Sequence, residues 1–182
     1  MNEFPHLIHV VDPNNNISQP AIKGDVGYDV IAASDPKIVG VKDEFSRGGY
    51  RSIDYIEYDL NIKADGFQPP ESSNEDVFTL IFPRSSISKY NLVLANSIGL
   101  IDSGFRSTFK VRFKYIFQPE DLNQNDLGGL YCVINFNKIY NKGDKICQLV
   151  FQKHFHPLIK YATELEQSQR DQGGFGSTSP QQ

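Results

Sequence analysis

The chain of 182 residues contains no tryptophan, a single methionine and two cysteines. Cys132 and Cys147 do not form a CxxC pair, and each lies within an apolar run, which is typical of buried reduced thiols rather than of a disulfide or a metal site. Positive charge is not in excess either, because the 18 Lys and Arg residues are outnumbered by 22 Asp and Glu residues and the formal net charge is -4. Non-specific binding to nucleic acid usually needs a basic surface, so we expect no nucleic-acid partner.

Long apolar segments are missing as well. No stretch reaches the ~18 apolar residues that a membrane-spanning helix needs. The N-terminal sequence MNEFPHLIHVVD does not combine a basic segment with a following apolar run. We therefore expect no signal peptide, no membrane partner and a cytoplasmic protein, in the host cell if the chain is viral. The length and the 39% of hydrophobic residues predict one domain with a sizeable core.

Helical periodicity is absent, and short β-type runs fill the chain. In Phe109–Phe117 every second residue is apolar, and Lys110, Arg112 and Lys114 fall between them, which indicates a strand with one buried face. Lys145–Phe155 alternates in the same way. These patterns predict an all-β protein, a sandwich or barrel. The expected strands are Leu7–Val11, Tyr55–Ile62, Val77–Phe82, Asn91–Ala95, Phe109–Phe117, Tyr131–Phe136 and Lys145–Phe151.

Two polar stretches and the C-terminal end interrupt this pattern. Residues 34–52 and 118–129 are rich in polar residues, and we interpret them as surface insertions that form loops. After Leu165 the only large apolar residue is Phe175. The domain is therefore expected to cover residues 1–165, and residues 166–182 are expected to form a flexible arm.

Five segments place polar residues or glycines where a plain β-domain would not need them. They are GDVGYDV (24–30), PRSSIS (83–88), ANSIGLIDSGFR (95–106), GDKICQLVF (143–151) and RDQGGFGSTS (170–179). Arg84 and the two serines after it could bind phosphate oxygens, or Ser85 or Ser86 could cap a helix. Asp102 could act as a general base, or its carboxylate could accept backbone N–H groups in a turn.

Two further features allow a ligand interpretation. The GGFGST sequence lacks the GxxxxGK[ST] phosphate-loop pattern, but a glycine-rich arm could close over phosphates while Phe175 stacks on a flat ring. His154 and His156 lie two residues apart, so a metal pair is conceivable, although no third ligand is close in sequence. A solvated strand end is the simpler interpretation of the histidines.

Taken together and in this order, the five segments resemble the five motifs of the trimeric deoxyuridine triphosphate nucleotidohydrolases, or dUTPases. The resemblance implies jelly-roll-like β-barrel subunits that form a homotrimer with shared active sites. It also implies magnesium-dependent hydrolysis of dUTP to dUMP and pyrophosphate, which limits uracil in DNA and supplies dUMP for thymidylate synthesis. The arm of residues 166–182 would cross to a neighbouring subunit and close over the bound nucleotide.

The resemblance also implies roles for individual residues. Asp102 would activate the water that attacks the α-phosphorus in line, and Asp29 would help to hold a hydrated Mg²⁺ ion. The residues expected to contact the substrate are Arg84, Ser85, Ser86, Asn96, Leu100, Ile101, Phe105, Lys110, Gln148, Arg170, Phe175, Gly176, Ser177 and Thr178.

The chain departs from the family pattern at a few positions. Phe105 stands where a tyrosine is usual, Ser107 replaces a common glycine, and Cys147 replaces an alanine. One alternative is the dCTP deaminases, which are similar in fold, but the strand position where they need a proton-shuttling glutamate aligns with Arg112. The other alternative is a non-catalytic module that senses nucleotides or binds proteins.

Overall fold

The computed structural model describes residues 8–66, 75–155, 157–164 and 166 of the chain. Within these ranges the only regular elements are strands and three short 3-10 helices. No helix in the described part of the chain is long and apolar enough to cross a membrane. The strands are β1 (Ile8–Val11), β2 (Ile17–Ser18), β3 (Tyr28–Ile31), β4 (Lys37–Lys42), β5 (Tyr50–Asp59), β6 (Lys63–Gly66), β7 (Glu75–Pro83), β8 (Leu92–Leu94), β9 (Gly99–Ile101), β10 (Lys110–Tyr115), β11 (Leu122–Gln124), β12 (Leu130–Cys132) and β13 (Lys145–Phe155), and the 3-10 helices are η1 (Ser85–Lys89), η2 (Pro119–Asp121) and η3 (Phe136–Lys138).

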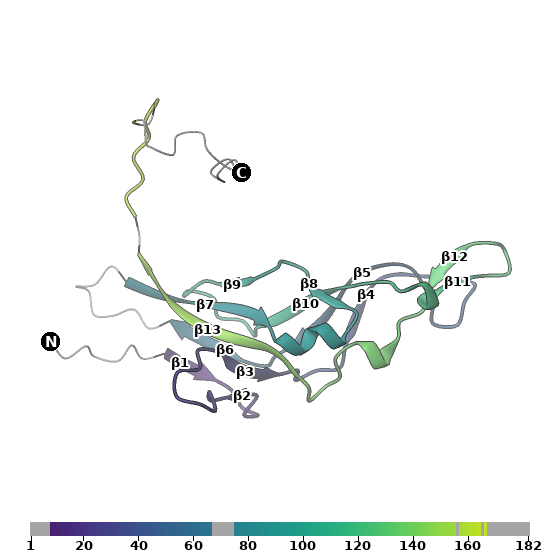
Figure 1. Ribbon diagram of the computed structural model, residues 1–182, viewed down its shortest axis with the longest axis horizontal. Helices are drawn as coiled ribbons and strands as arrows, with labels where there is room; N and C mark the ends of the chain where they lie inside the picture. The colour runs from purple at the N-terminus through teal and green to yellow at the C-terminus, as the bar shows by residue number, and fades with distance from the viewer. Residues whose placement is uncertain (1–7, 67–74, 156, 165, 167–182) are drawn as a thin grey trace, which may run out of the picture.

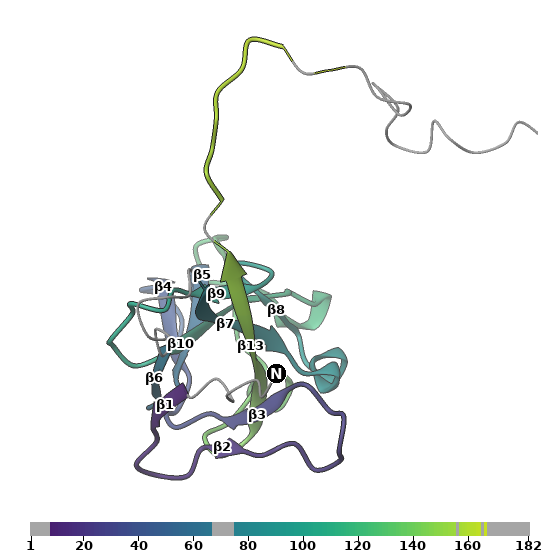
Figure 2. The ribbon, with the colours of Figure 1, turned by 90° about the vertical axis from the view of Figure 1, so that its left-hand side faces the viewer.

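The strands form two curved antiparallel sheets that enclose one core (Figures 1 and 2). One sheet has the order β11-β12-β5-β10-β8, with β4 also paired to β5. The other has the order β2-β3-β13-β7-β9, and β1 pairs with β6 in a small third sheet. This arrangement confirms the all-β class that the alternating runs predict and the jelly-roll-like barrel that the resemblance implies.

The core lies between the two large sheets and follows the strand periodicity. Along β10 every second residue is buried, as predicted, and Val111, Phe113 and Tyr115 face inward. From the opposite sheet, Ile81 and Leu149 are buried against them. Each fully buried side chain of this size contributes roughly 1.5–3 kcal/mol to folding. The alternating pattern therefore stabilises β10 with this face toward the core. Both cysteines are buried free thiols, as expected.

The interpretation of residues 34–52 and 118–129 as loops is wrong. The first stretch contains β4, whose Ile38, Val39 and Val41 suit a pleated strand, and it continues into β5. The second contains η2 and β11, and β11 pairs with β12. In the first stretch the polar residues lie mainly in the turn between β4 and β5, and in the second the three residues of β11 are exposed at the edge of a sheet.

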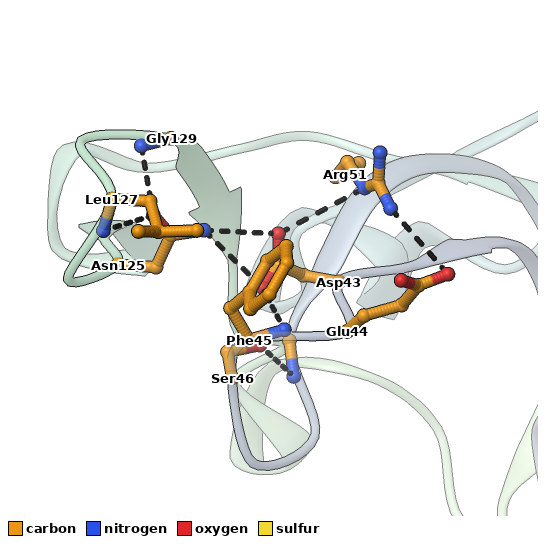
Figure 3. Close-up of polar contacts among 9 residues, drawn as sticks. Asp43, Glu44, Phe45, Ser46, Arg51, Asn125, Leu127 and Gly129 are labelled. Atoms are coloured by element: carbon orange, nitrogen blue, oxygen red, sulfur yellow. Dashed lines mark hydrogen bonds and ion pairs between the residues drawn. The ribbon is translucent and has the colours of Figure 1, made fainter.

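The β4–β5 turn and the β11–β12 hairpin meet at one end of the molecule (Figures 1 and 3). Asp43 is buried, and its carboxylate accepts hydrogen bonds from the Phe45 N–H at 3.0 Å and from Asn125 Nδ2 at 3.3 Å. The Asn125 Oδ1 atom in turn accepts the Gly129 N–H at 2.8 Å and so closes its own hairpin. A polar lock centred on Asp43 and Asn125 therefore joins two segments that are 82 residues apart in sequence.

The remaining strand predictions hold in position but not in length. The predicted strand at 131–136 ends at Cys132, because Asn135 caps η3 by accepting the Asn137 N–H. The strand at 145–151 extends to Phe155 along β7. Residues 157–164 follow β13 as an exposed segment that leads away from the sheets (Figures 1 and 2).

Candidate active site

A charged cluster forms where β3, β7 and β13 lie side by side. Gln148 in the middle of β13 pairs with Asp29 on β3 and with Phe82 near the end of β7. Arg84 follows β7, and its Nε–H donates to Asp29 Oδ1 at 2.8 Å. Lys145 Nζ donates to Asp29 Oδ2 at 3.0 Å, and Gln148 Nε2 donates to Asp29 Oδ1 at 3.1 Å. The sheet thus brings together three sequence-predicted residues, Asp29, Arg84 and Gln148.

The electrostatics of this cluster favour an anion. Burial tends to raise the pKa of Asp29, but hydrogen bonds from Lys145 and Gln148 and the charge of Arg84 outweigh it, so the pKa lies below its usual value. Within the cluster itself the two cations outnumber the one carboxylate of Asp29, and Asp25 adds a second carboxylate to the wall of the adjoining cavity. The cluster opens into a cavity of about 420 Å³ that Gly27 and Asp25 also line.

Gly27 keeps Gln148 against this cavity. A Cβ atom on Gly27 would lie 3.0 Å from Gln148 Cδ, which is closer than such contacts normally allow. The absence of a side chain on Gly27 therefore leaves room for the Gln148 side chain that donates to Asp29.

The segment after β7 forms a tight turn with free hydroxyls. Arg84 is the N-cap residue of η1, and no side chain caps this helix. The alternative that Ser85 or Ser86 serves as a helix cap is therefore wrong. Ser85 is exposed and Ser86 is half-buried, so both hydroxyls flank Arg84 without a capping role.

The third motif forms a hairpin from β8 to β9 over a second cavity. Ser97 has a φ of 61° in the turn. A Cβ atom on Gly99 would lie 3.0 Å from Ile81 Cβ, so a side chain at this position would crowd β7 where β9 pairs with it. The cavity has a volume of about 680 Å³. Its lining includes the sequence-predicted residues Asn96, Leu100, Ile101, Phe105 and Lys110.

Asp102 lies directly after β9, between Ile101 and Phe105, which both line this cavity. Its carbonyl accepts the Phe105 N–H at 3.0 Å and closes the turn. Its carboxylate is exposed and makes no hydrogen bond or ion pair within residues 8–66 and 75–155. The alternative in which this carboxylate satisfies turn N–H groups is therefore wrong, and the group is available to a water molecule or a ligand.

One copy of the chain does not bring Asp102 and Arg84 together. Ile101 pairs with Thr79 on β7, so Asp102 lies beside Phe78. Arg84 lies six residues further along the chain, directly after the end of β7. At ~3.3 Å per residue the two positions are about 20 Å apart. The charged cluster and the hairpin cavity are therefore two separate half-sites.

Comparisons with known proteins agree with this arrangement of motifs. A family model described as dUTPase matches residues 124–179. The deoxyuridine 5'-triphosphate nucleotidohydrolase of Escherichia phage T5 is 35% identical over 103 residues, 56% of this chain and 57% of that protein. The enzyme of the same name from Rhodococcus erythropolis is 27% identical over 175 residues, 92% of this chain and 82% of that protein.

The chain is therefore similar to dUTPases in sequence. The match spans just over half the length of the phage T5 relative. Solved structures of dUTPases share the fold. A variant of the Staphylococcus bacteriophage 80alpha dUTPase with dUpNHpp superposes with a TM-score of 0.60 at 20% identity, covering 96% of this chain and 99% of that one. A variant dUTPase of phage phi11 of S. aureus, described with a structural Mg(II) ion, has a TM-score of 0.55 at 21% identity, covering 89% of this chain and 100% of that one.

The fold brings two cations to the half-sites that the motifs did not predict there, Lys145 and Arg112. Lys145 contacts Asp29 directly, and the only signal for it was its place in the segment GDKICQLVF. Arg112 lines the hairpin cavity, although sequence reasoning used it only to disfavour a deaminase. The predicted arm residues Arg170, Phe175, Gly176, Ser177 and Thr178 lie outside the described residues.

The half-site around Asp29 fits a magnesium ion only together with substrate phosphates, because the Asp29 carboxylate already accepts hydrogen bonds from Arg84, Lys145 and Gln148. Mg²⁺ dehydrates reluctantly and is usually held by one or two carboxylates together with substrate phosphates. Asp29 supplies an ionised carboxylate, and Asp25 lines the same cavity. No group of three or more His, Cys, Asp or Glu side chains that could hold a metal occurs among the described residues. His154 packs edge-on against Phe78, and His156 lies outside the described part of the chain.

Proposed function

We propose that this chain hydrolyses dUTP to dUMP and pyrophosphate. The observation that carries the proposal is the unpartnered Asp102 carboxylate at the edge of a cavity lined by the family's base-reading hairpin. The names of the relatives from phage T5 and Rhodococcus erythropolis support the same reaction. The product dUMP can supply thymidylate synthesis, and removal of dUTP limits uracil in DNA. An enzyme of this kind acts on precursors of DNA in the cytoplasm, that of the host if the chain is viral.

In the proposed mechanism Asp102 accepts a proton from a water molecule aimed at the α-phosphorus. The exposed carboxylate suits this role because no internal partner has to be displaced. Asn96, Leu100 and Ile101 hold the base and sugar on the hairpin, and Phe105 packs beside them. The ring of Phe105 keeps the apolar surface of the usual tyrosine and lacks only its hydroxyl group.

The charged cluster receives the phosphates. Arg84 offers a fork of N–H donors, the Ser85 and Ser86 hydroxyls flank it, and Gln148 and Lys145 add further donors. Asp29 would hold a hydrated Mg²⁺ ion together with the triphosphate, and the ion would neutralise the charge that develops on pyrophosphate. Lys110, at the edge of the hairpin cavity, completes the predicted substrate contacts within the described residues.

We further propose that three copies share each active site. The separation of about 20 Å between the Asp102 and Arg84 positions is too long for one α-phosphate to contact both residues of one chain. In a homotrimer, Asp102 of one subunit could face the cluster around Asp29 of the next. The arm of residues 166–182 would then close over the nucleotide, with Arg170, Gly176, Ser177 and Thr178 at the phosphates and Phe175 on the base.

The test is pyrophosphate release by the purified full-length chain with dUTP, dCTP, dTTP and UTP, with Mg²⁺ and with a chelator. We expect release from dUTP, little from the other three, and loss of activity with the chelator. Ammonia release from dCTP would instead indicate a deaminase. Binding of dUTP without any turnover would indicate the sensing module and contradict the proposal.

The deaminase alternative has little support at its key position. Arg112 stands where the proton-shuttling carboxylate is needed, and its Nε–H donates to Glu57 Oε2 at 2.8 Å. Burial tends to raise the pKa of Glu57, but the hydrogen bond from Arg112 and the charge of Lys110 hold it below its usual value. An ionised, ion-paired glutamate under an arginine is a poor proton shuttle.

A further inference from the structure

The outward face of β10 carries three cations along the wall of the hairpin cavity. Lys110, Arg112 and Lys114 alternate with the buried residues of this strand, and all three line the cavity of about 680 Å³. In a chain with a net charge of -4, this is a local concentration of hydrogen-bond donors beside the base-reading hairpin. The three side chains differ, however, in how they are held.

Arg112 is held from two sides. It pairs across the sheet with Glu57, a residue that is only 7% exposed, and the Arg112 Nε–H donates to Glu57 Oε2 at 2.8 Å. The guanidinium carbon lies 4.4 Å from the centre of the Tyr55 ring. An ion pair along one edge and an aromatic ring under one face fix the plane of the guanidinium group before any ligand arrives.

The terminal nitrogens of Arg112 remain available. Neither Nη1 nor Nη2 has a hydrogen-bond partner in the described part of the chain, because the Glu57 contact uses Nε. The Arg112 backbone carbonyl accepts the Ala95 N–H at 2.9 Å, so this residue lies directly against the start of the hairpin turn. A fixed donor group therefore faces the cavity that Asn96, Gly99 and Leu100 line.

Lys110 and Lys114 are engaged differently. The Lys110 ammonium group lies 3.5 Å from Glu57 Oε1, and Lys114 Nζ donates to the Asp54 carbonyl at 2.7 Å. Both are flexible point charges, whereas the guanidinium group presents a planar set of donors. Of the three cations, Arg112 is the one with both a fixed position and unused donors.

We propose that Arg112 is a specificity-determining residue that reads a carbonyl oxygen of the pyrimidine base and rejects an amino group at the same position. This inference rests on the proposed binding of deoxyuridine nucleotides to the hairpin. Uracil carries a carbonyl acceptor at ring position 4, whereas cytosine carries an amino donor there. The guanidinium group can only donate. With cytosine bound, its N–H groups would face the N–H groups of the amino substituent, and this pairing of donor with donor is unfavourable.

The test compares full-length variants that differ at one position of β10. Arg112→Met removes the donors but keeps a long apolar stem, and Arg112→Lys keeps the charge but not the planar fork. Lys114→Met is the matched control, because it removes a cation from the same face and the same cavity wall. Titration calorimetry with dUMP and with dCMP measures base selectivity without the triphosphate, and kcat/KM for dUTP and dCTP measures it in turnover.

We expect Arg112→Met to lower the ratio of dUMP to dCMP affinity about tenfold or more, as the loss of one charge-assisted hydrogen bond to the base carbonyl predicts. Arg112→Lys should fall between this variant and the parent, and Lys114→Met should stay within about twofold of the parent. Equal losses for both nucleotides would overturn the inference and indicate a phosphate or packing role. An unchanged ratio in folded Arg112→Met, or in Arg112→Lys if the first variant does not fold, would also overturn it. If the parent chain prefers dUMP yet releases no pyrophosphate from dUTP, the proposed function fails while the role of Arg112 stands.

Discussion

At the scale of single residues, the proposed chemistry depends on a carboxylate that the fold leaves without a partner. We expect Asp102→Asn to retain nucleotide binding and to lower pyrophosphate release by roughly 10²–10⁴-fold, the contribution typical of a positioned general base. Release assays and calorimetry with a non-hydrolysable dUTP analogue check this. Asp126→Asn, on an exposed loop, is the control for loss of one negative charge. Turnover by Asp102→Asn at the parent rate would show that another group activates the water.

Two buried tyrosines give a second prediction at this scale. The Tyr58 hydroxyl donates to the Tyr140 carbonyl at 2.8 Å, whereas the Tyr140 hydroxyl is buried without a hydrogen-bond partner among the described residues. Burial raises the pKa of Tyr140 to about 12. Removing an unsatisfied hydroxyl costs little, but removing a donor leaves a buried carbonyl unpaired, which costs about 1–3 kcal/mol.

Urea unfolding of the two phenylalanine variants measures this difference. We expect Tyr140→Phe to match or exceed the stability of the parent and Tyr58→Phe to lose about 1–3 kcal/mol of the free energy of unfolding. A large loss in Tyr140→Phe would show that this hydroxyl has a partner in solution.

At the scale of elements, the lock between the β4–β5 turn and the β11–β12 hairpin is separable from the two half-sites. Asp43→Ala removes the acceptor for the Phe45 N–H and for Asn125 Nδ2, so we expect a loss of about 1–3 kcal/mol. Hydrogen exchange should accelerate in both hairpins and much less in β7 and β13. Pyrophosphate release should stay near the parent value. A comparable loss of turnover would link this end of the molecule to the active site.

At the scale of the whole molecule, two carboxylates give the stability a defined dependence on pH. The pKa values of Asp29 and Glu57 lie below their usual range, because their cationic partners outweigh the effect of burial. In the unfolded chain the pKa values of these carboxyl groups are about 4. The unfolded state therefore binds more protons in acid, and the stabilisation is complete above about pH 5 and is lost as the pH falls through the folded pKa values.

Urea unfolding between pH 3 and pH 7 tests this pH dependence. We expect the free energy of unfolding to fall below about pH 5, and to fall less steeply in Glu57→Gln, which cannot titrate at this position. The control is Asp126→Asn, an exposed carboxylate with the same change in charge. An identical pH slope in Glu57→Gln and the parent would contradict the assignment.

The separation of the half-sites gives a prediction about assembly. Arg84→Ala and Asp102→Asn should each be inactive alone, because each lacks one half of every site. Co-expressed or refolded together, they should regain part of the activity, since mixed trimers contain some sites with an intact Asp102 from one chain and an intact Arg84 from another. A mixture that stays inactive, although mass spectrometry shows mixed oligomers, would place both residues in one chain's own site.

Much of the fold and site was accessible from local patterns in the sequence. The alternation along β10 predicted its buried face, because a strand with one buried face has an apolar residue at every second position. Asp29, Arg84 and Gln148 were predicted through their motifs, and the fold brings them within hydrogen-bonding distance. The edge strand β4 was missed although Ile38, Val39 and Val41 favour a strand, because the polar and glycine-rich residues of the following turn dominate the composition of residues 34–52.

The sequence alone determined the β class, the core-facing residues and the five motifs, because periodicity and turn chemistry act over a few residues. The tertiary structure decided which motifs meet. Pairing of β13 with both β3 and β7 assembled the charged cluster and added Lys145. Pairing of β10 with β5 placed Glu57 under Arg112. These contacts join strands that are distant along the chain, and strand register has no local periodicity from which to read it.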